Sequence, residues 1–512
     1  MGREVKKESD GSTNLLLIAL LLAQLGASVF FVLALMRLNI LQMWQLLAVT
    51  GILVVLFALN SFLIRKTMTS KVVASVISML VIFGTLLGSR YAGTAAGFIE
   101  AATGPQYETQ TYKVLTLKNS AYDDIKVLSR QHIGFLTSNP NIINTKSALK
   151  TAVDYKESDY DDLGSLINAL YDHYVAGIVL NDSYLTYLEE ESEDTSVNFI
   201  EESRVIYEFE VRADVEDVRN PVDVITEPFI IYISGSDSRG EISQTARSDV
   251  NIVSVINPKT NKILLISIPR DYYVQLHGTV GTPDKLTHAG IYGIEMSKTT
   301  IEDLLGININ YTVKVGFQAV QKLVDAIGGI DIVSDQALSI RSEDGTMCNI
   351  VEGPNHLSGG CALRYSRERY SYATGDRHRG QNQQQVLTEI IKKITDLHYA
   401  TRWPQILDAT KGTFETSLSY DEITKFARFE LATLKKWSIE SIQLDGTGSS
   451  QPTYSMGSRL LYVMIPDQAT IDNAKAKITE TVADPVEEEP EDAGEGSEEE
   501  SASQDAEETP EE

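Results

Sequence analysis

The chain is poor in cysteine and in basic residues. Only Cys348 and Cys361 occur among 512 residues, and no histidine pattern accompanies either of them, so a cysteine nucleophile is not indicated. Lysine and arginine together number 44 against 71 acidic residues, a formal net charge of −27. After Thr479 there is no lysine or arginine at all, and Glu, Asp, Ser, Ala and Pro dominate. Such a segment cannot bury an apolar core, so we expect residues 479–512 to form a disordered acidic tail.

Long apolar runs occur only near the N-terminus. Residues 14–36, 43–64 and 71–93 are three apolar stretches, and each is long enough to cross a hydrocarbon layer of roughly 30 Å. Because two further stretches follow the first, it does not read as a cleavable signal peptide. The sequence therefore predicts three transmembrane helices within residues 14–95.

Basic residues flank these stretches unevenly, and their distribution predicts the topology. Three precede the first stretch, one follows it, and three lie between the second and third: Arg3, Lys6, Lys7, Arg37, Arg65, Lys66 and Lys71. The positive-inside rule then places residues 1–13 in the cytoplasm and everything after the third helix outside the cell. An extracellular location argues against nucleic acid as a partner. In an oxidising compartment an even pair of cysteines favours a disulfide between Cys348 and Cys361.

Residues 105–225 differ in composition from what precedes and follows them. They are rich in Tyr, Asp and Glu, with helical patterns at Asp123–Leu136 and Ser147–Asp154 and a strand-like alternation at Ile206–Val211. We interpret them as a small α+β accessory domain. They contain no catalytic constellation, so spacing the site from the bilayer and docking partners are the roles we expect.

Five arginines gather in the sixteen residues from Arg364 to Arg379. On a strand, Arg367 and Arg369 would point to the same face, roughly 7 Å apart. That spacing suits the two phosphates of a diphosphate, since guanidinium groups pair with phosphate oxygens in a bidentate manner. The alternative is a solvated edge strand that carries alternating charge.

Two aspartates lie where they would meet these arginines. Asp237 follows an apolar run in the turn Gly-Ser-Asp-Ser-Arg, a common position for a functional loop. Residues 250–256 and 262–268 read as strands joined by a turn at 257–261. In such an antiparallel hairpin, Asp249 and Arg270 would be neighbours.

Asp237 and Asp249 together with converging arginines look like a site for Mg²⁺ and a pyrophosphate, because Mg²⁺ prefers few carboxylates plus phosphate oxygens. Each aspartate alone also has a structural interpretation. Asp237 would then be a turn former and Asp249 a strand-end cap.

Several motifs, in order, resemble the LytR-CpsA-Psr family. The resemblance covers about residues 226–400, and we expect it to continue to about 475. It is carried by GSDSR, RSD, VINPKTNKILLISIPRDYYV, KLTHA, LLGI, VDAIGGIDI, HLSGGCALRYSRER and GDRHRGQNQQQVL. The resemblance implies a Gram-positive cell envelope protein that moves a glycopolymer from a polyprenyl-diphosphate lipid to peptidoglycan. The three helices and the accessory domain resemble the streptococcal capsule-type members, which favours capsular polysaccharide as the glycopolymer and capsule-synthesis proteins as further partners.

The resemblance also implies roles for individual residues. Asp237 and Asp249 match the Mg²⁺ ligands of the family. The pyrophosphate-binding set corresponds to Arg247, Arg270, Arg367, Arg369, Arg379 and Gln383. Within it, Arg270 and Arg367, with Asp249, are the catalytic candidates. The run DRHRGQNQQQ departs from the family pattern, so Arg377 stays an alternative to Arg379, and HGTVGTP is slightly longer than usual.

We expect residues 226–478 to form an α/β catalytic domain with a central mixed β-sheet and helices on both faces. Helical patterns occur at residues 297–305, 317–327, 382–397, 405–411 and 421–435, and short strands near 441–444 and 459–465. The apolar face of the helix near Val386 is interpreted as core, with a tunnel for a polyprenyl tail as the alternative. His288 in KLTHA is interpreted as a structural histidine rather than a general base.

The function predicted from these features is Mg²⁺-dependent glycopolymer phosphotransfer outside the cell membrane. Two other functions remain open at this point. One is a polyprenyl-diphosphate pyrophosphatase that uses the same residues with water as the acceptor. The other is a non-enzymatic membrane regulator of capsule synthesis that binds lipid-linked intermediates.

Overall fold

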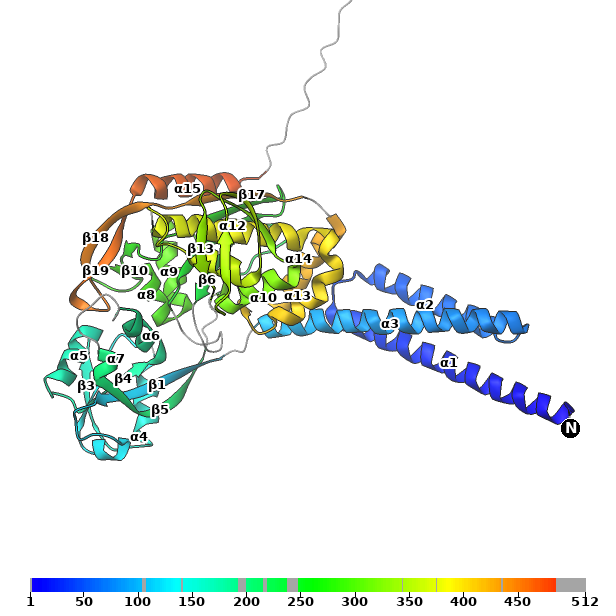
Figure 1. Cartoon of the computed structure of the whole chain (residues 1–512), viewed down its shortest axis with the longest axis horizontal. Coiled ribbons are helices and arrows are strands. Elements are labelled where there is room, and N and C mark those ends of the chain that lie inside the picture. Colours follow the sequence, from blue (N-terminus) through cyan, green and yellow to red (C-terminus); the bar gives the residue numbers. More distant parts are fainter. Residues whose placement is uncertain are drawn as a thin grey trace, which may run out of the picture.

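The protein consists of a helical bundle and two sheet-containing domains, as the computed structural model in Figure 1 shows. The structure describes residues 2–103, 107–139, 141–191, 199–214, 219–236, 247–342, 344–373, 375–433 and 436–484. The bundle projects from one side of the larger domain, and the smaller domain lies toward the opposite side.

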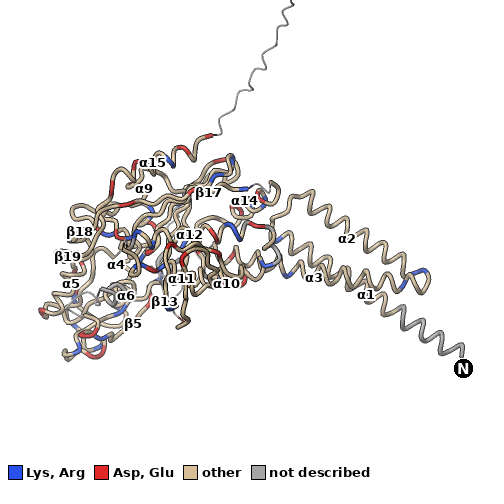
Figure 2. Tube along the Cα trace, turned by 45° about the horizontal axis from the view of Figure 1, so that its top comes forward, with Lys and Arg blue, Asp and Glu red and all other residues tan. Residues whose placement is uncertain are grey.

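Three helices form the bundle, and all three are long and apolar enough to cross a membrane. They confirm the three predicted apolar helices, although α3 continues beyond the predicted end: α1 (Gly2–Leu38), α2 (Met43–Leu63) and α3 (Met68–Ala102). With 35 residues, α3 is about 52 Å long, which exceeds a hydrocarbon layer of about 30 Å. Figure 2 shows few charges along the bundle, apart from basic residues at the α2–α3 turn, far from the sheet domains.

A polar triad lies inside the bundle. Asn60 Nδ2 donates hydrogen bonds to Gln24 Oε1 at 2.9 Å and to Ser78 Oγ at 3.0 Å, and Ser78 Oγ donates to Gln24 Oε1 at 2.8 Å. Each residue comes from a different helix, and all three are fully buried. Hydrogen bonds between helices in an apolar setting hold the three helices in one arrangement.

The larger domain contacts the near end of the bundle. Tyr420 donates a hydrogen bond to the carbonyl of Arg37 at 2.9 Å, and Arg428 donates to the carbonyls of Asn39 and Ile40, which follow α1. On α3, the ring of Phe98 meets that of Phe414 edge to face, with centroids 6.4 Å apart. These contacts fix the larger domain at this end of the helices.

The smaller domain contains a five-stranded mixed sheet in the order β3-β2-β4-β1-β5. The predicted helix at Asp123–Leu136 is wrong, because Arg130 adopts a left-handed φ of 62° that ends a short 3₁₀ turn before strand β2 begins. The elements of this accessory domain are β1 (Tyr107–Leu117), η1 (Ile125–Leu128), β2 (His132–Leu136), α4 (Ile142–Lys150), β3 (Lys156–Tyr160), α5 (Leu163–Tyr171), β4 (Gly177–Asn181), α6 (Asp182–Glu191), α7 (Phe199–Glu202) and β5 (Ser203–Asp214).

The larger domain is built on a six-stranded sheet in the order β16-β11-β6-β7-β8-β17. The pairs β11–β6 and β8–β17 are parallel, whereas β6–β7, β7–β8 and β11–β16 are antiparallel, so the predicted mixed sheet is confirmed. Its strands are β6 (Phe229–Ser236), β7 (Val250–Asn257), β8 (Lys262–Ile268), β11 (Tyr311–Gly316), β16 (Phe414–Thr416) and β17 (Ser438–Gln443).

Helices pack on this sheet and around its edges, and their apolar faces form the core. One cluster joins Tyr232, Val253 and Ile266 of the sheet to Ile301 of α9 and Ile471 of α15. The helices are α8 (Leu286–Ala289), η2 (Gly290–Tyr292), α9 (Ile294–Leu305), α10 (Phe317–Ile327), α11 (Gly359–Arg367), α12 (Asp376–Thr395), η3 (Leu397–Arg402), α13 (Trp403–Thr410), α14 (Tyr420–Thr433) and α15 (Gln468–Val482).

Four short antiparallel strand pairs complete the larger domain. They are β9–β10, β12–β15, β13–β14 and β18–β19. Their bounds are β9 (Tyr273–Val274), β10 (Asp284–Lys285), β12 (Ile330–Ser334), β13 (Leu338–Arg341), β14 (Met347–Ile350), β15 (Gly353–Leu357), β18 (Gly446–Thr453) and β19 (Gly457–Pro466).

Two boundaries differ from those expected. Arg367 and Arg369 do not lie on a strand, because Ala362, Leu363 and Ser366 bury one face at helical spacing and make residues 359–367 a helix. Arg367 is the last residue of this helix, α11, and Arg369 follows it. The helix α15 continues to Val482, so the acidic tail begins later than residue 479.

Candidate functional site

The hairpin of β7 and β8 brings Asp249 and Arg270 together. The register pairs Asn251 with Ile268, so the residue just before β7 lies beside the residues just after β8. Arg270 Nη1 lies 3.0 Å from Asp249 Oδ1, and the two side chains are only 14% and 11% exposed. This is the arrangement that antiparallel pairing predicted.

Asp249 is surrounded by positive charge. Burial raises the pKa of this carboxyl, but the guanidinium groups of Arg270, Arg247 and Arg379 outweigh burial and hold the pKa well below its usual range. Thr287 Oγ1 also donates a hydrogen bond to Asp249 Oδ1 at 3.2 Å. We call Asp249, Arg247, Arg270 and Arg379 the arginine centre.

A second carboxylate, which the sequence analysis did not identify, lies between Arg270 and Lys285. Asp271 Oδ1 is 3.4 Å from Lys285 Nζ, and Asp271 Oδ2 is 3.7 Å from Arg270 Nε. Burial raises the pKa of Asp271, while Arg270, Lys285 and Arg379 together lower it below its usual value. In the sequence Asp271 directly follows Arg270, and Lys285 lies in KLTHA, but the burial that makes this lysine require an acidic partner is seen only in the structure.

The structure distinguishes Arg379 from Arg377. Arg379 is buried and acts on both Asp249 and Asp271, whereas Arg377 is 53% exposed and pairs with Asp445 at 3.0 Å. Residues two apart on a helix point about 200° apart, so only one of these two arginines faces the arginine centre.

Arg367 and Arg369 are held by aromatic rings at the end of α11. The Arg367 guanidinium carbon lies 4.6 Å from the ring centroid of Phe317, and Arg369 donates a hydrogen bond to the hydroxyl of Tyr370 at 2.6 Å. Such stacking fixes the planar guanidinium groups. Gln383 is half-buried on α12, one turn after Arg379.

The predicted metal site is only partly visible. Asp237 lies outside the described residues, and within the described ranges no three His, Cys, Asp or Glu side chains gather as a metal cluster. Asp249 is a mostly buried carboxylate that the arginines keep ionised. One ionised carboxylate beside several arginines is a set that would fit Mg²⁺ together with a phosphate, because Mg²⁺ takes one or two carboxylates and completes its shell with phosphate oxygens and water.

Two further groups flank the site. Cys348 and Cys361 form a disulfide that ties β14 to the first turn of α11, the helix that ends at Arg367.

His288 is fully buried, and its Nδ1 lies 2.6 Å from Asp284 Oδ1. Its burial and this short contact agree with the structural interpretation of the histidine.

Three comparisons relate this chain to known proteins. Residues 191–478, more than half of the chain, match the LytR_cpsA_psr family. Over 248 residues the chain is 33% identical to the polyisoprenyl-teichoic acid–peptidoglycan teichoic acid transferase TagU of Bacillus anthracis. This alignment covers 48% of this chain and 77% of TagU. It is 34% identical to TagU of Enterococcus faecalis over 228 residues, 44% of this chain and 72% of that relative. The crystal structure of B. subtilis TagV aligns at 26% identity over 50% of this chain and 98% of TagV, with a TM-score of 0.42.

Proposed function

The chain belongs to the LytR_cpsA_psr family, and we propose that it transfers a glycopolymer from a polyprenyl-diphosphate lipid to peptidoglycan. The name of TagU assigns that type of transfer, with teichoic acid as the glycopolymer, to the relative from Bacillus anthracis. The observation that carries the proposal is the arginine centre, in which three arginines surround one ionised carboxylate.

The charge of this region suits a diphosphate. Among the described residues, Arg247, Arg270, Arg379 and Lys285 contribute four positive charges, and Asp249 and Asp271 contribute two negative ones, so the sum is +2. Four of these groups are buried, and Asp249 and Arg270 are mostly buried, so their electrostatic interactions are screened less than at the surface. A site of this kind stabilises the negative charge of a diphosphate and of its transition state.

The chemistry follows from that placement. A hydroxyl oxygen of peptidoglycan attacks the sugar-linked phosphorus, and the bond from that phosphorus to the bridging oxygen breaks. The bridging oxygen leaves with the bonding electron pair, and the hydroxyl proton passes to solvent. The products are a phosphodiester that joins glycopolymer to peptidoglycan and a polyprenyl phosphate. Phosphoryl transfer requires mainly positioning and charge stabilisation, which Arg270 and Arg379 would supply.

Asp249 is assigned to organising charge rather than to accepting a proton. A carboxylate whose pKa is held this low is a poor base near neutral pH. Asp249, with Asp237, would hold Mg²⁺, and when bound the ion would supply further neutralisation of the phosphate oxygens.

We propose capsular polysaccharide as the glycopolymer. The support is the part of the chain outside the family match, since the bundle and the accessory elements from β1 to β4 precede residue 191. This organisation resembles the streptococcal capsule-type members, whereas the TagU relatives cover less than half of the chain.

The proposed topology places both sheet domains outside the cell membrane. Arg65 and Lys66 lie at the α2–α3 turn, at the far end of the bundle (Figure 2), and the positive-inside rule assigns that end to the cytoplasm. The disulfide between Cys348 and Cys361 fits an oxidising exterior.

The test uses the full-length protein in lipid nanodiscs, a short polyprenyl-diphosphate-linked glycan and peptidoglycan fragments, with and without Mg²⁺. Mass spectrometry follows the phosphodiester product and the released polyprenyl phosphate. We expect Arg270→Ala, which removes a transition-state donor, to lower transfer roughly 10²–10³-fold. Asp249→Ala removes the carboxylate that pairs with Arg270 and would hold Mg²⁺, and we expect a loss on the same order. Arg377→Ala, which alters an exposed arginine of the same segment, is the matched control.

Each other outcome identifies a different function. Glycan phosphate released without attachment to peptidoglycan would indicate a pyrophosphatase. Lipid that binds but is never cleaved would indicate a regulator. Wild-type transfer by both Arg270→Ala and Asp249→Ala would contradict the proposed site.

A further inference from the structure

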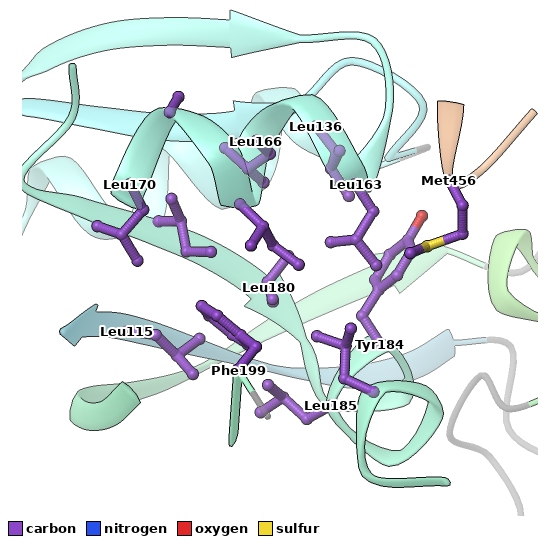
Figure 3. Close-up of a cluster of buried hydrophobic side chains, with 14 of the residues drawn as sticks. Leu115, Leu136, Leu163, Leu166, Leu170, Leu180, Tyr184, Leu185, Phe199 and Met456 are labelled. Carbon is purple, nitrogen blue, oxygen red and sulfur yellow. The ribbon is translucent and has the colours of Figure 1, made fainter. Parts of the chain in front are cut away.

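The tip of the β18–β19 hairpin, Thr453–Gly457, belongs to the larger domain but completes the core of the accessory domain. Met456 is 2% exposed and packs in the same cluster as Leu163 and Tyr184. In Figure 3 the Met456 side chain comes from a separate segment of the chain and lies beside Tyr184. The backbone joins as well, since the Leu163 N–H donates to the Ser455 carbonyl at 2.8 Å.

The same tip is bonded on its other side to the segment that supports the arginine centre. The Ser455 N–H donates to Asp284 Oδ2 at 2.9 Å, and Ser455 Oγ lies 3.0 Å from His288 Nδ1. Asp284, His288 and Ser455 are all buried, so each depends on these hydrogen bonds to offset its loss of water.

Thr287, next to His288, contacts the arginine centre directly. Its hydroxyl donates to Asp249 Oδ1 at 3.2 Å, and its N–H donates to the Arg270 carbonyl at 2.9 Å. Its own carbonyl accepts from the Ser248 N–H at 3.2 Å. A shift of residues 284–289 would therefore move both partners of the buried ion pair.

We propose that the hairpin tip couples the accessory domain to the arginine centre, with Ser455 as a positioning residue for Asp249 and Arg270. The series of contacts runs from α5 through the hairpin tip to Asp284 and His288, and from there to Thr287. The catalytic consequence rests on the proposed function, whereas the coupling itself does not. A partner that moves the accessory domain would change the rate of transfer by this route.

One substitution in the accessory domain perturbs this series of contacts without changing a residue of the larger domain. A Cβ at Gly164, on α5, would lie 2.7 Å from the carbonyl oxygen of Met456, which is closer than real contacts allow. Alanine favours the helix, so Gly164→Ala preserves α5 and displaces the hairpin tip. Asn168→Ala, at an exposed position of the same helix, is the matched control.

The first readout is hydrogen–deuterium exchange of full-length protein in nanodiscs, which needs no substrate. We expect Gly164→Ala to speed exchange of the amides in residues 284–289 on the order of tenfold, and Asn168→Ala to leave it unchanged. Unchanged exchange in Gly164→Ala, with the displaced tip itself exchanging faster, would overturn the coupling.

The second readout is transfer. Because small misplacements of catalytic groups cost rate more than binding, we expect Gly164→Ala and Ser455→Ala to lower kcat about tenfold and to change KM less than about twofold. Ser455→Thr should restore kcat, and Ser450→Ala, at an exposed position of β18, should leave it unchanged.

Altered exchange with no transfer even by wild type would refute the proposed function and leave the coupling supported. Altered exchange with wild-type kcat in both variants would overturn Ser455 as a positioning residue.

Discussion

The accessory domain and the larger domain each carry a cluster of opposite charges, and the two clusters are built differently. On the accessory sheet edge, Lys146 and Lys150 pair with Glu157 and Asp159 at distances of 2.5 to 3.0 Å. Two positive charges meet two negative ones, and Lys150 is 54% exposed. In the arginine centre, by contrast, three arginines surround the single carboxylate of Asp249, and the members are nearly buried.

Two properties together distinguish a ligand site from a surface ion-pair network: the charged side chains are buried, and the positive and negative charges are unequal in number. Exposed pairs are screened by water and salt, and a balanced set leaves no charge to attract an anion. A buried cluster with excess positive charge costs folding free energy unless an anion or a metal–anion complex completes it. If the proposed function holds, the arginine centre loses some folding stability in exchange for a preorganised phosphate site, whereas the accessory cluster has only a modest effect on stability.

The largest predicted contrast is between Arg379→Ala and Lys150→Ala. Removing the buried guanidinium of Arg379 takes away charge that acts on both Asp249 and Asp271, so transfer should fall roughly 10²–10³-fold. Removing Lys150 should leave transfer unchanged. Both variants should keep the wild-type melting temperature within a few degrees, which differential scanning fluorimetry checks. Equal effects on transfer would show that burial and imbalance do not mark the site.

The pH dependence of stability gives a second contrast. The pKa of Asp249 is lower in the folded protein than its unfolded value of about 3.9, so the unfolded state binds more protons as pH falls. The stability that ionised Asp249 contributes is therefore complete above about pH 5 and is lost as pH falls through and below about 4. Asp249→Asn should lower the melting temperature most near neutral pH, and the difference from wild type should shrink below about pH 4.

The control for this experiment is Glu157→Gln. The pKa of Glu157 is also lowered, first by hydrogen bonds from Lys150 and Lys146, so the sign of the effect is the same. Because this group is part-exposed, the change in melting temperature should be much smaller. A melting-temperature difference for Asp249→Asn that stays constant from pH 7 to pH 3 would mean that its carboxylate charge does not stabilise the fold.

The same contrast explains which features the sequence predicted. Antiparallel pairing depends only on local alternation and a turn, so residues 250–268 were enough to place Asp249 beside Arg270. The arginine segment was misinterpreted because alternating charge at Arg367 and Arg369 fits a strand. The buried residues upstream recur at helical spacing instead, at Gly359, Ala362, Leu363 and Ser366.

Contacts between domains left no comparable signal. Ser455 and Met456 lie in a short turn, and their importance comes from Leu163 and Asp284, which are remote in sequence. A helix-breaking left-handed residue such as Arg130 is equally invisible to periodicity. Sequence patterns thus predicted the pairing of Asp249 with Arg270, whereas the contacts of the hairpin tip that support this pair were seen only in the structure.

The smallest predicted effect concerns the accessory cluster itself. Glu157→Gln keeps the size of the side chain and removes the charge that pairs with Lys146 and Lys150. For a surface pair we expect a loss of roughly 0.2–1 kcal/mol in the free energy of unfolding at low ionic strength, measured by urea denaturation. On the order of 0.5 M NaCl should remove most of this difference, because screening then acts within a few ångströms. A loss above about 2 kcal/mol that resists salt would show that the accessory cluster behaves as a buried one, and the distinction between the two clusters would fail.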